Sequence, residues 1–123
     1  FDIPILGICL GHQLIAKAYG GQIDTSNTES YAKVEIDIIN DENLFTGLAS
    51  KMEVWSSHKD EVKTIPNDFE ILANSNLCDV ESFKHKTKDV YGIQFHPEVH
   101  HTPKGSTIFE NFYKICEERC NND

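Results

Sequence analysis

The order of apolar and polar positions predicts strands and helices within one short chain. Positions 4–8 are apolar throughout, which is typical of a strand buried on both faces of a parallel sheet. Apolar residues then recur at helical spacing through 10–19, and Gly20 and Gly21 provide a C-terminal stop. The apolar positions of this helix are Leu10, Leu14, Ile15 and Ala18. We therefore predict a strand, a sharp turn at Cys9 and a helix.

The rest of the pattern is mostly that of strands. Residues 32–40 alternate, with Val34, Ile36 and Ile38 on one face. A short helical turn is expected after Asp41. Further strands are predicted over 52–55, 69–73, 80–83 and 90–95, and a helix from 105 to about 118. The apolar stripe of this helix is Ile108, Phe109, Phe112, Ile115 and Cys116. We expect one α/β domain over 1–123, with a mostly parallel sheet and flanking helices.

Charge and composition exclude several kinds of partner. The net charge is −9, whereas nucleic acids and anionic membranes bind surfaces with a surplus of Lys and Arg. No run of apolar residues approaches the ~20 of a membrane span. The four cysteines contain no CxxC pair, so reduced thiols in a cytoplasmic protein are expected.

Cys9 lies in a pattern that is typical of a nucleophile. Gly7-Ile8-Cys9-Leu10-Gly11 has the G-x-nucleophile-x-G form of a nucleophile elbow. Such a turn holds the nucleophile in a strained backbone conformation, and glycines on either side prevent clashes between strand and helix. The positive end of the helix dipole favours the thiolate, and the N–H of Leu10 is placed to bind an oxyanion. The alternative is a buried cysteine that packs as a small apolar residue.

A base and its orienting group follow the strand predicted over 90–95. His96 and Glu98 are two residues apart, so their side chains point the same way in an extended segment. Glu98 could then bond one imidazole nitrogen while the other faces a thiol. Metal binding by His96, Glu98, His100 and His101 is the less favoured alternative, because adjacent histidines suit no common tetrahedral site. We predict no metal site.

The longer strings around these residues resemble a known family. Gly-Ile-Cys-Leu-Gly-His-Gln at 7–13 and His-Pro-Glu at 96–98 are similar to the motifs of class I, triad-type glutamine amidotransferases. The resemblance implies a flavodoxin-like fold and a Cys9–His96–Glu98 triad. It also implies that Gln13 helps to bind L-glutamine, and that the backbone around Ser57 and His58 receives its α-amino acid end.

Other segments are most similar to the amidotransferases of GMP synthetases. These are Val54-Trp55-Ser56-Ser57-His58-Lys59-Asp60 and the residues that follow Glu98. The resemblance implies that the partner is a separate ATP-pyrophosphatase subunit, which would bind ATP and Mg and use the ammonia to aminate xanthosine monophosphate. It implies no cofactor in this chain. The alternatives are the glutaminase of an anthranilate, carbamoyl-phosphate or imidazole-glycerol-phosphate synthase, a γ-glutamyl hydrolase, or an inactive binding subunit.

Members of this family carry further βα units ahead of the nucleophile turn. These units include a Gly-Gly-Pro loop that gives a second oxyanion donor. The resemblance therefore predicts that residues 1–123 are the C-terminal portion of an amidotransferase domain, truncated at its N-terminus.

Overall fold

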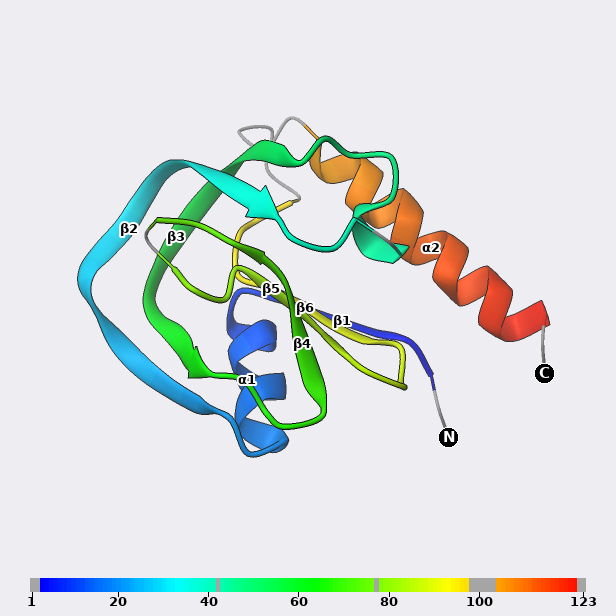
Figure 1. Cartoon of the computed structure of the whole chain (residues 1–123), viewed down its shortest axis with the longest axis horizontal. Coiled ribbons are helices and arrows are strands. Elements are labelled where there is room, and N and C mark those ends of the chain that lie inside the picture. Colours follow the sequence, from blue (N-terminus) through cyan, green and yellow to red (C-terminus); the bar gives the residue numbers. More distant parts are fainter. Residues whose placement is uncertain (1–2, 42, 77, 98–103, 122–123) are drawn as a thin grey trace.

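The computed structural model shows one sheet with a helix on each face (Figure 1). It describes residues 3–41, 43–76, 78–97 and 104–121, and the side chains of these residues except 25–32, 56–60, 120 and 121. The elements in chain order are β1 (Ile5–Ile8), α1 (Leu10–Ala18), β2 (Gln22–Ile38), the 3-10 turn η1 (Asn43–Phe45), β3 (Lys51–Thr64), β4 (Phe69–Asn74), β5 (Ser82–His85), β6 (Val90–Ile93) and α2 (Gly105–Asn121).

The strands follow the order β1-β6-β5-β4-β2-β3 across the sheet. The α/β class agrees with the prediction, but the described sheet is mixed. Only β1 and β6 pair in parallel within it, and the other pairings are antiparallel. Consecutive strands with short connections, such as β5 and β6, pair antiparallel, whereas a parallel pair needs a long crossover. The expectation of a mostly parallel sheet is therefore wrong for the described part.

The two faces of β6 contact different helices. Tyr91 and Ile93 belong to an apolar cluster that includes Ile108 of α2, whereas Val90 belongs to a second cluster with Ala16 of α1. Successive side chains of a strand point to opposite faces, so α1 and α2 cover opposite faces of the sheet. All four residues of β6 are buried, which places this strand at the centre of the fold.

The β2–β3 pair is longer than the pattern predicted, because only part of it alternates. Its register runs from Gln22 opposite Thr64 to Asp37 opposite Lys51, with an irregularity between Thr25 and Ser30. The pair curves around the left side of the molecule in Figure 1. The segment 22–31 is largely polar and lacks an apolar period, so its pattern does not predict a strand.

Helix α1 buries a different face from the expected one. Leu10 and Leu14 are 64% and 57% exposed, and the buried residues are His12, Gln13 and Ala16. The two polar side chains can lie against the sheet because each has a partner there. The ring of His12 stacks on a phenylalanine of β5, and Gln13 bonds a glutamine that follows β6.

Two further predicted core positions are partly exposed. Ile5 is 42% exposed, because β1 pairs only with β6 within the described residues and is an edge strand rather than one buried on both faces. Phe109 of α2 is 37% exposed, while Ile108 beside it is fully buried. The 100° step between neighbouring helical positions separates these two residues.

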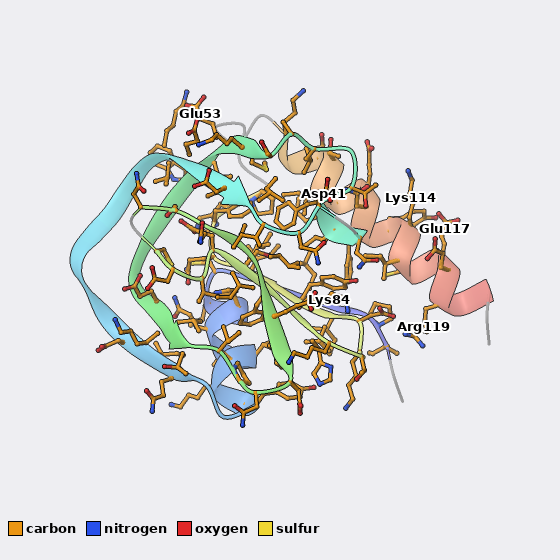
Figure 2. All side chains as sticks on the ribbon, viewed as in Figure 1. Asp41, Glu53, Lys84, Lys114, Glu117 and Arg119 are labelled. Carbon is orange, nitrogen blue, oxygen red and sulfur yellow. The ribbon has the colours of Figure 1, made fainter. Side chains whose placement is uncertain are left out.

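Helix α2 is held to the sheet at both ends by polar contacts. Near its start, the Asn111 amide donates to the carbonyl oxygens of Leu44 and Thr46 over 2.8 and 2.9 Å. Near its end, Arg119 Nε donates to Asp89 over 3.0 Å. Figure 2 shows Arg119 with other charged side chains along α2. Neither α1 nor α2, as far as they are described, combines the length and apolar character that crossing a membrane requires.

Candidate active site

Cys9 occupies the predicted elbow between β1 and α1. Its backbone has φ 54° and ψ −102°, a region that residues with a Cβ rarely adopt. A Cβ on Gly7 would lie 2.6 Å from Ile15 Cδ1 and 2.7 Å from the carbonyl carbon of Gly11, so the close approach of strand and helix requires glycine there. A Cβ on Gly11 would meet nothing within 4 Å, and the steric role predicted for this second glycine is therefore wrong.

The sulfur of Cys9 lies at the start of α1, next to a buried amide. The Cys9 backbone N–H donates to Ile93 at the end of β6 over 2.8 Å, which ties the turn to the neighbouring strand. Its side chain makes no capping hydrogen bond to α1. Instead, Gln94 Nε2 donates to Cys9 Sγ over 3.7 Å. The N-terminal end of a helix and a hydrogen-bond donor both favour the thiolate.

His96 leaves the sheet at the same edge as Cys9. Strands β1 and β6 are parallel neighbours with Ile8 opposite Ile93, so Cys9 and His96 both follow the carboxyl ends of adjacent strands. The His96 N–H donates to the Trp55 carbonyl over 3.0 Å, which is an isolated antiparallel bridge to β3. The imidazole is half-buried. A nucleophile and a base on neighbouring strand ends form the arrangement that covalent catalysis by cysteine requires.

The predicted substrate residues are placed by three different elements. Gln13 of α1 is 7% exposed, and its Nε2 donates to Gln94 Oε1 over 3.3 Å. Leu10 is the first residue of α1, where backbone N–H groups have no partner within the helix and point away from it. Ser57 and His58 lie in β3 opposite Tyr31 and Ser30, and their side chains fall outside the described part.

One predicted catalytic residue has no described position. Glu98 falls in the segment 98–103, outside the described residues, as do His100 and His101 of the alternative metal set. Of that set the structure places only His96. Elsewhere in the described chain, no three His, Cys, Asp or Glu residues come together as metal ligands would.

An open cavity of about 450 Å³ adjoins the elbow on the α1 side. Its lining includes the oxyanion candidate Leu10 and the substrate candidate Gln13, together with Lys17 and Asp24. Concave space next to the predicted nucleophile is what a small substrate needs.

Comparison with known proteins identifies the family. The glutamine amidotransferase class I family model matches residues 1–116. The chain belongs to the class I glutamine amidotransferase family. This confirms the family predicted from the strings around Cys9 and His96.

The relatives of this amidotransferase chain agree with the predicted subgroup. It is 91% identical to the glutamine-hydrolyzing GMP synthase subunit of Methanobrevibacter smithii over 123 residues, which are 100% of this chain and 65% of that protein. The corresponding subunit from Methanothermobacter thermautotrophicus is 61% identical over 94% of this chain and 62% of its own length. The chain therefore spans slightly less than two thirds of these relatives.

The solved structures confirm the amidotransferase fold. A protein from Thermoplasma acidophilum, assigned as a GMP synthase subunit, superimposes with a TM-score of 0.95 at 41% identity, over 98% of this chain and 61% of that one. A glutamine amidotransferase from Thermotoga maritima superimposes with a TM-score of 0.73 at 26% identity, over 98% and 50% of the two chains.

Gln94 is the residue of this amidotransferase that sequence reasoning missed. It is fully buried and contacts both Cys9 and Gln13. A signal for it existed, because Gln94 precedes His96 by two residues just as His96 precedes Glu98. The period of two that grouped the histidine with the glutamate would have added the glutamine.

Proposed function

We propose that this chain carries the glutaminase site of a GMP synthase, with Cys9 as nucleophile and His96 as base. The observation that carries the proposal is the elbow itself. Cys9 has a strained backbone at the start of α1, and the residue that follows β6 donates a hydrogen bond to its sulfur. His96 follows that residue by two positions and leaves the same edge of the sheet.

The reaction begins with attack by the Cys9 thiolate on the side-chain amide carbon of glutamine. The carbonyl oxygen becomes an oxyanion, which the N–H of Leu10 stabilises. His96, oriented by Glu98, protonates the amide nitrogen, and the C–N bond breaks to release ammonia. A γ-glutamyl thioester on Cys9 remains.

The second half of the reaction regenerates the thiolate. His96 accepts a proton from water, which attacks the thioester carbon. The C–S bond then breaks, glutamate leaves, and Cys9 is again a thiolate. Gln13 and the backbone around Ser57 and His58 hold the substrate during both steps.

The destination of the ammonia is the second part of the proposal. The GMP synthase relatives support a partner that is an ATP-pyrophosphatase subunit, in which ATP and Mg drive the amination of xanthosine monophosphate to GMP. Within the present chain no cofactor takes part.

The proposal assigns the chain to the C-terminal portion of a larger domain. In the described part, β1 is an edge strand. The exposed apolar side chains beside it are Ile3, Ile5, Leu10 and Leu14. An unpaired edge with apolar flanks is a surface that folded proteins normally cover. We expect further βα units of the full-length protein to cover it.

Cys9→Ala in the full-length protein tests the proposal, together with the ATP-pyrophosphatase subunit. We expect glutamine-dependent GMP synthesis to be lost, while synthesis from added ammonium continues at the wild-type rate. Retention of glutamine-dependent synthesis by this variant would rule out Cys9 as the nucleophile. Loss of both activities would show that the substitution disturbs the complex, and the assignment of the ammonia route would fail.

A further inference from the structure

The side chain of Gln94 joins the proposed nucleophile to a proposed substrate contact. Its Nε2 donates to Cys9 Sγ over 3.7 Å, and its Oε1 accepts from Gln13 Nε2 over 3.3 Å. Gln94 is 0% exposed and Gln13 is 7% exposed, so bulk water does not compete strongly for these groups. A buried amide needs partners for both its oxygen and its nitrogen, and these two contacts supply one to each.

The backbone on both sides of Gln94 is held by hydrogen bonds. The Gln94 N–H donates to Glu81 over 2.8 Å, and the His96 N–H donates to Trp55 over 3.0 Å. The Cys9 N–H donates to Ile93, the residue before Gln94, over 2.8 Å. The amide and the sulfur therefore share one rigid framework, so their separation is set by the fold.

The contact with Gln13 decides which end of the Gln94 amide faces the sulfur. An amide oxygen only accepts hydrogen bonds and an amide NH₂ only donates. With the Gln94 oxygen bonded by Gln13, the NH₂ is directed at Cys9. A donor stabilises a thiolate more than a thiol, because hydrogen bonds to charged acceptors are the stronger ones.

We propose that Gln94 is a further catalytic residue, whose amide N–H keeps the Cys9 sulfur ionised and aimed, with Gln13 holding the amide in that orientation. This role rests on the proposed function of Cys9 as the nucleophile. It adds a second stabilising contact for the thiolate besides the N-terminal end of α1. Gln13 then acts on the nucleophile as well as on the substrate.

The pH dependence of Cys9 alkylation in the full-length protein tests this role without substrate. Iodoacetamide reacts with the thiolate, and mass spectrometry of the Cys9 peptide follows this site alone. In Gln94→Met, which keeps the length of the side chain and lacks the donor, the midpoint of the rate profile should rise by about one pH unit. At neutral pH this corresponds to about tenfold slower alkylation. An unchanged midpoint, or a shift to lower pH, would overturn the proposal.

A second substitution and a control separate this effect from loss of structure. Gln94→Glu keeps an acceptor for Gln13 but replaces the donor by a charge that repels a thiolate, so its midpoint should also rise. Asn111→Leu removes a buried amide that bonds Leu44 and Thr46, far from the elbow in the fold, and should leave the midpoint unchanged. A shift in Asn111→Leu equal to that of Gln94→Met would assign the effect to general destabilisation and overturn the proposal.

The outcome also separates this inference from the proposed function. If Cys9→Ala abolishes glutamine hydrolysis but Gln94→Met has a wild-type alkylation profile, only the role of Gln94 fails. If Cys9→Ala retains glutamine hydrolysis, the proposed function fails whatever the profile of Gln94→Met.

Discussion

The backbone N–H of His96 donates to the carbonyl oxygen of Trp55 over 3.0 Å, which attaches the proposed base to β3. This bond does not involve the imidazole. Replacing the side chain should therefore leave the backbone in place, and kinetic effects can be assigned to the lost proton transfer.

His96→Ala should lower the rate of glutamine hydrolysis by about 10²- to 10⁴-fold, the usual contribution of a positioned acid–base group. Steady-state assays with glutamine and with ammonium measure this, and only the glutamine reaction should fall. His85→Ala is the matched control, because His85 Nδ1 accepts from the backbone of Thr87 and Lys88 over 3.1 and 3.0 Å and serves the β5–β6 turn. Equal losses of activity in both variants would contradict the role of His96.

The two glycines around Cys9 should respond oppositely to alanine. A Cβ on Gly7 would lie 2.7 Å from backbone atoms of Gly11, which cannot move aside without displacing α1. Gly7→Ala should therefore lower the free energy of unfolding by about 1–3 kcal/mol, the usual cost of overpacking. Gly11→Ala meets nothing and lies within a helix, so it should be neutral or stabilising by up to about 1 kcal/mol. Urea unfolding of the two variants checks this order, and a more stable Gly7→Ala would refute it.

The strongest sequence motifs predicted the elbow and the strand end well, because local spacing alone dictates both. The G-x-C-x-G string requires a tight turn, and the apolar residues before His96 require a buried strand. Contacts between distant segments were not predictable in this way. Gln13 and Gln94 are 81 residues apart in the chain, and only the pairing of β1 with β6 brings them together.

The same limit explains the errors over α1 and the sheet. Apolar spacing assigned Leu10 and Leu14 to the buried face, whereas His12 and Gln13 are buried through contacts with distant strands. Strand direction depends on the connections between strands, which an apolar period does not encode.

The buried carboxyl of Glu81 should make stability depend on pH. Burial raises its pKa to about 7, the hydrogen bond from Ser75 at 2.6 Å opposes the rise, and the charge of Glu61 adds to it. Between the ordinary value of 4.5 and about 7, the folded state holds a proton that the unfolded state has lost. The free energy of unfolding should therefore fall as pH rises through this window and level off above it.

Glu81→Gln should remove this dependence. It should be more stable than the wild type at pH 8, by up to about 3 kcal/mol from the size of the shift, and similar to it at pH 4.5. Urea unfolding at both pH values measures the difference. The exposed Glu53, labelled in Figure 2, offers the control, since Glu53→Gln should leave the pH dependence unchanged. Equal pH profiles for Glu81→Gln and the wild type would exclude Glu81 as the source.

The two hydrogen bonds of Asn111 should contribute to stability but not to the chemistry. Its amide supplies donors to the carbonyls of Leu44 and Thr46, and Leu44 is fully buried. Asn111→Leu leaves these carbonyls without that donor and should lower the free energy of unfolding by about 1–3 kcal/mol. Asn111→Asp should cost more at neutral pH, because it places negative charge against two carbonyl oxygens. Since α2 lies on the opposite face of the sheet from α1, the rate of glutamine hydrolysis per folded molecule should be unchanged in both variants. A kinetic loss without a loss of stability would instead show that α2 communicates with the Cys9 elbow through the sheet.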